Sequence, residues 1–111
     1  MKINIFDYAE YHRYLKDFYE ESKRINPTSF SYASLASKGG YLNEDMVFTI
    51  FNSMDTQLTL GDCIRLSIAI DHTAIEAEYF RCIVALSQAS NEHEKNYFKE
   101  MKMRIIEENN T

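Results

Sequence analysis

The stretch FSYASLASKGGYLNEDMVFTIFNS, residues 30–53, decides the fold of this chain. Ser31 is a good helix N-cap, because its side-chain oxygen can accept a hydrogen bond from a free backbone N–H of the first turn. The pair Gly39-Gly40 then ends that helix, because glycine adopts a left-handed C-cap conformation without strain. Asn43 caps a second short helix in the same way. The stretch therefore predicts two short helices joined by a glycine-containing turn.

Small and apolar residues within this stretch indicate how the two helices pack. Ala36 in the first helix is small enough to let the second helix approach closely, and Gly40 takes the turn four residues later. Met46 then falls where an apolar side chain would lock the second helix against the first. This arrangement predicts a helix-turn-helix at about residues 31–53, although many plain helical hairpins share the pattern.

Caps and breakers divide the rest of the chain into further helices. Asp7 is expected to cap a first helix that runs to about Arg24, because Asn26-Pro27 forces the backbone out of the α region. Thr59, Thr73 and Asn91 each stand before an apolar-periodic segment. The expected fold is an all-α bundle of five or six helices in one domain, residues 1–111. Its elements are helices at about 7–24, 31–38, 43–54, 59–70, 74–89 and 91–108, with fraying over 107–111.

The segment after Thr59 differs from the other helices in its hydrophobic pattern. Its apolar residues are spread nearly all round the helix instead of forming one stripe: Leu60, Cys63, Ile64, Leu66, Ile68 and Ile70. A helix that is apolar all round is normally buried. The sequence therefore predicts that this helix is central in the bundle and buried.

Charge is distributed unevenly along the chain. The net charge is −5, and the most acidic part is residues 27–90, which hold only three basic side chains: Lys38, Arg65 and Arg81. Proteins that bind nucleic acid usually carry a coherent basic face, since contacts to phosphates supply much of the affinity. The charge pattern therefore disfavours nucleic-acid binding by the middle of the chain.

Groups of residues with catalytic or metal-binding spacing are missing from the sequence. His12, His72 and His93 are far apart and none is near a cysteine, so no zinc signature is present. Cys63 and Cys82 lie among apolar residues, which is typical of buried free thiols. We expect a cytoplasmic protein that is not an enzyme, with no cofactor, no metal and no membrane segment.

Several short motifs, spread in order over nearly the whole chain, resemble an uncharacterised bacterial family of predicted transcriptional regulators. They are IFDY (5–8), YLKDFYEE (14–21), NP (26–27), FSY (30–32), EAEYF (76–80) and EKNY (94–97). Family members have an N-terminal, lambda-repressor-like helix-turn-helix followed by a C-terminal domain of unknown function. The resemblance implies a helix-turn-helix module of a regulator, with double-stranded DNA as its partner.

The chain departs from this family in two respects. Family members are more than twice as long, so the chain corresponds either to a short paralogue or to an excised N-terminal region. The family also follows its recognition helix with a Gly-Lys-Arg-Asn turn, whereas SMDTQ (53–57) stands here without any basic residue. The residues expected to contact DNA are Lys38, Asn43, Thr49 and Asn52.

An alternative reading of the second helix makes it a protein interface. Met46, Val47, Phe48, Ile50, Phe51 and Met54 cannot all point into one small core. Surplus apolar surface often marks a site of protein contact. This alternative predicts a protein-interaction or dimerisation module that kept the helix-turn-helix and lost DNA binding. Its interface residues are Phe48, Phe51 and Met54, and a further homodimer surface is expected on the last two helices at Phe80, Val84, Phe98 and Met101.

Overall fold

The protein is all-α, as the sequence predicts. A computed structural model describes residues 2–111, and within them it contains helices and no strand. A short 3-10 helix, η1, precedes six α-helices. Their bounds are η1 Ile5–Asp7, α1 Tyr11–Ile25, α2 Tyr32–Gly39, α3 Glu44–Asn52, α4 Leu60–Ile70, α5 Ala74–Gln88 and α6 Glu92–Asn109.

Most of the predicted caps are confirmed. Ser31, Thr59 and Thr73 cap α2, α4 and α5 as parts of capping boxes. In each box the side chain of the cap accepts from the backbone N–H of the third helical residue, and the side chain of that residue accepts from the backbone N–H of the cap. Asn43 and Asn91 cap α3 and α6. These caps are local interactions between residues three apart, which explains why the sequence alone located them.

The prediction for the first helix is wrong at its N-terminus. Asp7 ends η1, and α1 begins only at Tyr11, because the Glu10 carboxylate accepts hydrogen bonds from the backbone N–H groups of His12 and Arg13. Glutamate is an uncommon cap, so the sequence favoured Asp7. The expected fraying over 107–111 is also wrong in part, since α6 continues to Asn109.

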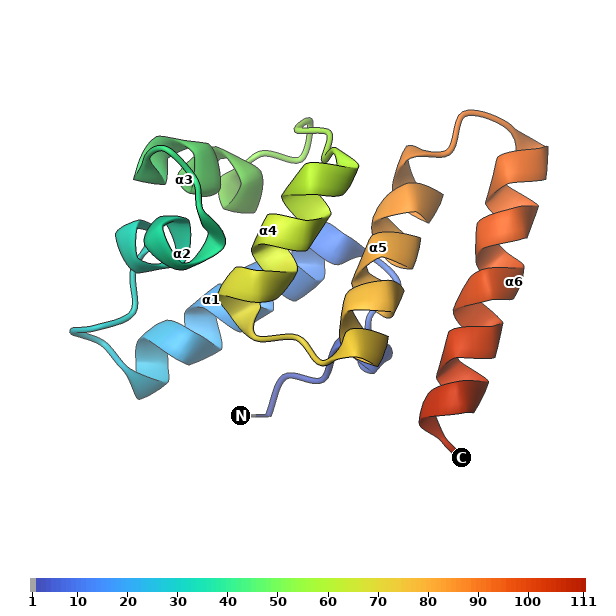
Figure 1. Ribbon diagram of the computed structural model, residues 1–111, viewed down its shortest axis with the longest axis horizontal. Coiled ribbons are helices and arrows are strands. Elements are labelled where there is room, and N and C mark those ends of the chain that lie inside the picture. The colour runs from blue at the N-terminus through green and yellow to red at the C-terminus, as the bar shows by residue number, and fades with distance from the viewer. Residues whose placement is uncertain (1) are drawn as a thin grey trace.

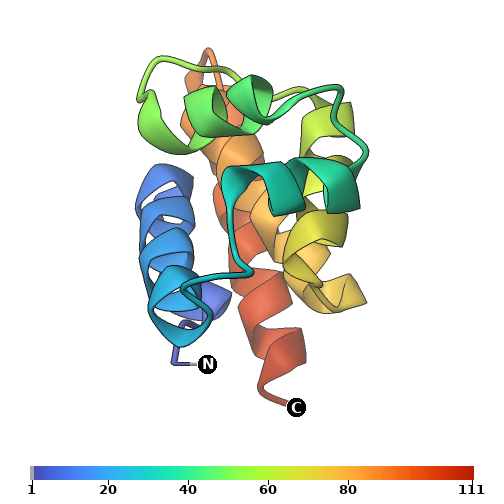
Figure 2. The same ribbon diagram turned by 90° about the vertical axis from the view of Figure 1, so that its left-hand side faces the viewer.

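The helices form one core, with α2 and α3 at one end of the molecule. Figure 1 shows α4, α5 and α6 side by side, with α1 passing behind α4. Helix α4 packs against α5, and α5 packs against α6. Figure 2 shows α3 above one end of α1, with α2 packed below α3 and to the side of α1. The largest fully buried side chains come from η1, α1, α3, α4 and α5 and belong to a single hydrophobic core. They are Ile5, Tyr11, Leu15, Val47, Leu66, Tyr79, Phe80, Cys82 and Ile83.

The close approach of α2 to α4 depends on a glycine at the end of α2. A Cβ atom on Gly39 would lie 2.9 Å from the carbonyl oxygen of Arg65, so no larger residue fits without moving the helices apart. Gly40 follows with a φ of 75° and forms the left-handed C-cap. The glycine pair therefore does two different jobs: Gly39 permits helix packing and Gly40 makes the turn.

The prediction that α4 is buried on all sides is wrong. Its inner side packs against α2 and α5 through Cys63, Leu66 and Ala69, which are buried. Leu60, Ile64 and Ile68 lie on the other side and are 59%, 50% and 56% exposed. No helix among residues 2–111 covers this outer side. The apolar residues that surround α4 therefore lie partly in the core and partly on the surface of the molecule.

Candidate functional site

The four residues expected to contact DNA do not form a basic surface. Asn43 is occupied as the α3 cap, its side-chain oxygen accepting from the Met46 backbone N–H at 3.2 Å. The Asn52 amide donates to the Tyr32 hydroxyl at 3.0 Å and to the Phe48 carbonyl at 2.8 Å. Thr49 is exposed on α3 without a cation on the same helix. The structure therefore places three polar groups around α3, and Lys16 of α1 lines the same hollow as Asn52.

Basic side chains near the α2–α3 hairpin are mostly engaged with groups of the chain itself. Lys38 forms an ion pair with Asp71, which follows α4. On α1, Arg13 pairs with Asp17, Arg24 pairs with Glu21, and the Lys23 ammonium donates to the Phe30 carbonyl at 2.8 Å. Exposed Glu44 and Asp45 begin α3. The charge that phosphates would meet at this hairpin is therefore close to neutral or negative.

The predicted protein-interface residues of α3 separate into exposed and buried. Phe48 is 52% exposed and lies edge-on to Tyr32, with ring centroids 5.2 Å apart. Met54 is exposed as well. Phe51, in contrast, is only 8% exposed and belongs to the core, so its assignment to an interface is wrong. Met46, predicted to lock α3 against α2, is 43% exposed, so that prediction is wrong as well. The exposed apolar side chains of α3 and its C-terminal turn are therefore Met46, Phe48 and Met54.

The further dimer surface expected on the last two helices is only partly exposed. Phe80 and Val84 are buried in α5, and Phe98 and Met101 of α6 are half-buried against the core. The close packing of α5 against α6 consumes these side chains within one chain. The apolar pattern of these two helices is therefore explained by their mutual contact.

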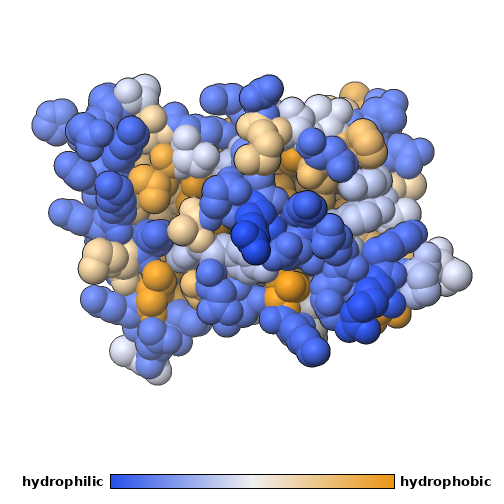
Figure 3. Space-filling model, turned by 180° about the vertical axis from the view of Figure 1, so that it is seen from behind, coloured by the Kyte–Doolittle hydropathy of each residue, from blue (hydrophilic) through white to orange (hydrophobic). Residues whose placement is uncertain are grey.

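The largest ordered array of exposed apolar side chains lies on α4, where the sequence predicted none. Leu60, Ile64 and Ile68 are spaced four residues apart, so their side chains lie one above another along three turns of the helix. We call this array the α4 stripe. The opposite face of the molecule, behind α4, is mostly hydrophilic with scattered apolar residues (Figure 3). Apolar surface in one continuous line is typical of a site that contacts another protein.

Two hollows between α4 and α5 border the α4 stripe. One, of about 370 Å³, includes Ile64, Ile68 and His72 in its lining, and the other, of about 340 Å³, includes Leu60 and the α6 residue Phe98. Cys63 and Arg81 line both hollows. The stripe is therefore the edge of a grooved apolar surface rather than a smooth cylinder, and it can accept the side chains of a partner.

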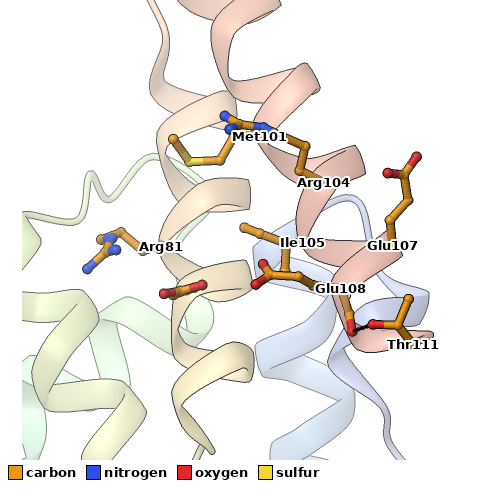
Figure 4. Close-up of a pocket in the computed structure, with 8 residues that line it drawn as sticks. Arg81, Met101, Arg104, Ile105, Glu107, Glu108 and Thr111 are labelled. Carbon is orange, nitrogen blue, oxygen red and sulfur yellow. Dashed lines mark hydrogen bonds between the residues drawn. The ribbon is translucent and has the colours of Figure 1, made fainter.

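Arg81 stands beside this groove and turns toward it. In the close-up of the neighbouring hollow between α5 and α6, the guanidinium of Arg81 extends toward α4, away from Glu107 and Glu108 (Figure 4). Arg81 and Cys63 of α4 line the same two hollows, which agrees with that orientation. Arg81 thus supplies positive charge along the α5 side of the α4 stripe.

A half-buried, hydrogen-bonded histidine, His72, lines one of the two hollows. Nε2 of His72 is 2.7 Å from the Tyr14 hydroxyl, and Nδ1 is 2.9 Å from the Ser67 hydroxyl. Burial lowers the pKa of His72 to about 4, against the opposing effect of Glu76. The ring is therefore neutral near pH 7 and links α1 to the turn between α4 and α5. This is a structural role, and the isolated histidine signal in the sequence could not reveal it.

The two cysteines are confirmed as buried free thiols. Burial is the main cause that raises the pKa of Cys63, to about 11, and burial also raises the pKa of Cys82. The Cys82 thiol donates to the Phe98 carbonyl, with sulfur and oxygen 3.2 Å apart. Because nucleophilic cysteines need a lowered pKa, neither thiol has the environment of a catalytic group.

Residues 2–111 contain no group of three or more metal-ligating side chains close enough to hold an ion. None of the helices described has the length and apolar character needed to cross a bilayer. Comparison with protein-family models, curated proteins and solved structures gives no match to this chain.

Proposed function

We propose that this chain is a protein-interaction module whose docking surface is the α4 stripe with its adjoining groove. The observation that carries the proposal is the exposure of Leu60, Ile64 and Ile68 on successive turns of one helix. Water contact with aliphatic surface is unfavourable by about 25 cal/mol per Å². A partner that covers the stripe removes this penalty, and the groove beside the stripe can accommodate side chains of that partner.

The size of this surface suits a helix or a small domain rather than a large assembly. Stable interfaces bury roughly 800 Å² on each partner. The three side chains of the stripe are too few for that area, but the two hollows between α4 and α5 extend the surface across to Phe98 and Arg81. The docking surface therefore comprises the stripe and both hollows together.

Site-specific photo-crosslinking tests this proposal. A photoreactive phenylalanine analogue at position 64 is expected to give one discrete protein adduct in cells that produce the chain. The same analogue at Met103, an equally exposed apolar position on α6, is the matched control and should give none. The adduct is identified by mass spectrometry and its binding reconstituted with purified proteins. Equal labelling from both positions, or none from position 64, would contradict a docking role for α4.

A helix-turn-helix regulator that reads DNA is the second candidate. The paired helices α2 and α3, with their Ser31 and Asn43 caps, and the family resemblance favour it. Against it, sequence positions 39–64 contain no lysine or arginine, and Lys38 pairs with Asp71. The α2–α3 hairpin itself therefore offers few of the phosphate contacts from which most DNA affinity derives.

Fluorescence anisotropy with a labelled mixed-sequence duplex separates the two candidates. At low salt, where phosphate attraction is strongest, we expect no saturable binding by the chain. Saturable binding that weakens with salt, and that is lost when Thr49 and Asn52 are both replaced by alanine, would instead support the regulator role. Double alanine replacement on α4, at Leu60 and Ile68, is the control that should leave any DNA signal unchanged.

A further inference from the structure

Two arginines stand on opposite sides of the α4 stripe. Arg65 lies on the α2 side, with its guanidinium carbon 5.8 Å from the centre of the Tyr41 ring. Arg81 lies on the α5 side and lines both hollows. Both side chains are exposed. The apolar stripe therefore runs between two positive charges, although the chain as a whole is acidic.

Neither arginine has an ion-pair partner among residues 2–111. The acids at the two ends of α4 are already used. Asp62 accepts from the Thr59 backbone N–H at 3.0 Å and from the Tyr41 hydroxyl at 3.1 Å, while Asp71 pairs with Lys38. Glu78, three residues before Arg81, lines the hollow between α5 and α6 with it but forms no ion pair with it, so both guanidinium groups are available to a partner.

A second copy of the chain is a poor match for this charge pattern. Two identical faces meet through a two-fold axis lying in the contact plane. If the axis crosses α4, the two helices run antiparallel and Arg65 and Arg81 each face their own counterpart. If the axis follows α4, the helices run parallel and Arg65 of one copy faces Arg81 of the other. Both arrangements oppose like charges, which disfavours association.

We infer that the α4 stripe docks an amphipathic helix of a partner protein that carries acidic side chains along both edges of its apolar face. This inference rests on the proposed function and specifies the occupant of the same site. Apolar residues of the partner, three or four positions apart, lie against Leu60, Ile64 and Ile68. Its carboxylates approach Arg65 and Arg81, where charge-assisted hydrogen bonds to guanidinium groups form.

Two synthetic peptides test the inference. Both are amphipathic helices of roughly 20 residues with the same leucine stripe at three- and four-residue spacing. One carries glutamate along both edges of the stripe, and the other carries lysine. Each is labelled and titrated with the full chain by fluorescence anisotropy. The acidic peptide is expected to bind saturably, and the basic peptide on the order of tenfold more weakly or not at all.

Charge reversal in the chain supplies the matched variants. Arg81→Glu is expected to lower the affinity of the chain for the acidic peptide on the order of tenfold and to raise its affinity for the basic peptide. Arg104→Glu, an exposed arginine on α6, is the control and should leave the preference unchanged. Ile64→Ser should weaken the binding of both peptides, because it interrupts the apolar contact with their leucine stripe. Thermal unfolding of each variant confirms that the fold is retained.

The possible results separate this inference from the proposed function. Equal binding of the two peptides would overturn the inference that the partner helix is acidic and leave α4 as the docking surface. A preference for the acidic peptide that survives in Arg81→Glu would have the same meaning. Failure of both peptides, combined with self-association in sedimentation equilibrium that Ile64→Ser abolishes, would make the occupant a second copy. Failure of both peptides without self-association, and without an adduct from position 64, would overturn both proposals.

Discussion

Replacing Leu66 by alanine is expected to lower the free energy of unfolding by about 2 to 5 kcal/mol, whereas Ile64→Ala should lower it by no more than about 1 kcal/mol. Leu66 is fully buried on the inner side of α4, so its truncation leaves a cavity among α2, α4 and α5. Ile64 is half exposed, so its truncation removes side-chain surface that water already contacts.

Urea unfolding of the two variants, followed by circular dichroism, measures this difference directly. The pair is well matched, because both residues are aliphatic and lie two positions apart in one helix. Alanine has the higher helix propensity at both positions, and leucine and isoleucine differ by only roughly a few tenths of a kcal/mol, so propensity cannot explain a difference of this size. Comparable losses of stability in the two variants would mean that the outer side of α4 is covered within the folded chain, contrary to the structure.

Lowering the pH from 7 to 5 is expected to destabilise the fold by about 2 kcal/mol through His72. Burial holds the pKa of the folded-state imidazole at about 4, below its ordinary value of 6.5. The unfolded chain therefore binds more protons than the folded chain between these two pKa values. Stability falls as the pH falls through that window, and the contribution of His72 is fully present only above the unfolded pKa.

Chemical unfolding at a series of pH values tests this expectation. His72→Gln keeps a side chain that can hydrogen-bond to Tyr14 and Ser67 but cannot titrate, so its stability should be nearly flat from pH 7 to pH 5. His93→Gln, at an exposed position in α6, is the control and should retain the slope. If the slope persists in His72→Gln, another group is responsible and the assignment to His72 fails.

The candidate site was only partly predictable from the sequence. The sequence predicts Phe48, Phe51 and Met54 as surface apolar residues, and Phe48 and Met54 are exposed. Phe51 is not, because it lies on nearly the same side of α3 as Phe48 and only the tertiary packing of Tyr19 and Tyr32 around it covers the ring. The α4 stripe is missed for a different reason. A helix that is apolar all round gives no periodic signal from which to tell its buried side from its exposed side.

Local interactions explain what the sequence by itself determined. The all-α class, the number of helices, most helix starts and the turn at Gly40 follow from caps and backbone preferences within a few residues of each position. The choice of the buried side of α4 belongs to the tertiary structure alone. It depends on Gly39 admitting α2 against one side of α4, and on α5 folding back against another, contacts between residues distant in sequence. No other helix in residues 2–111 covers the remaining side of α4. The candidate site lies there and consists of Leu60, Ile64 and Ile68, with Arg65 and Arg81 on either side.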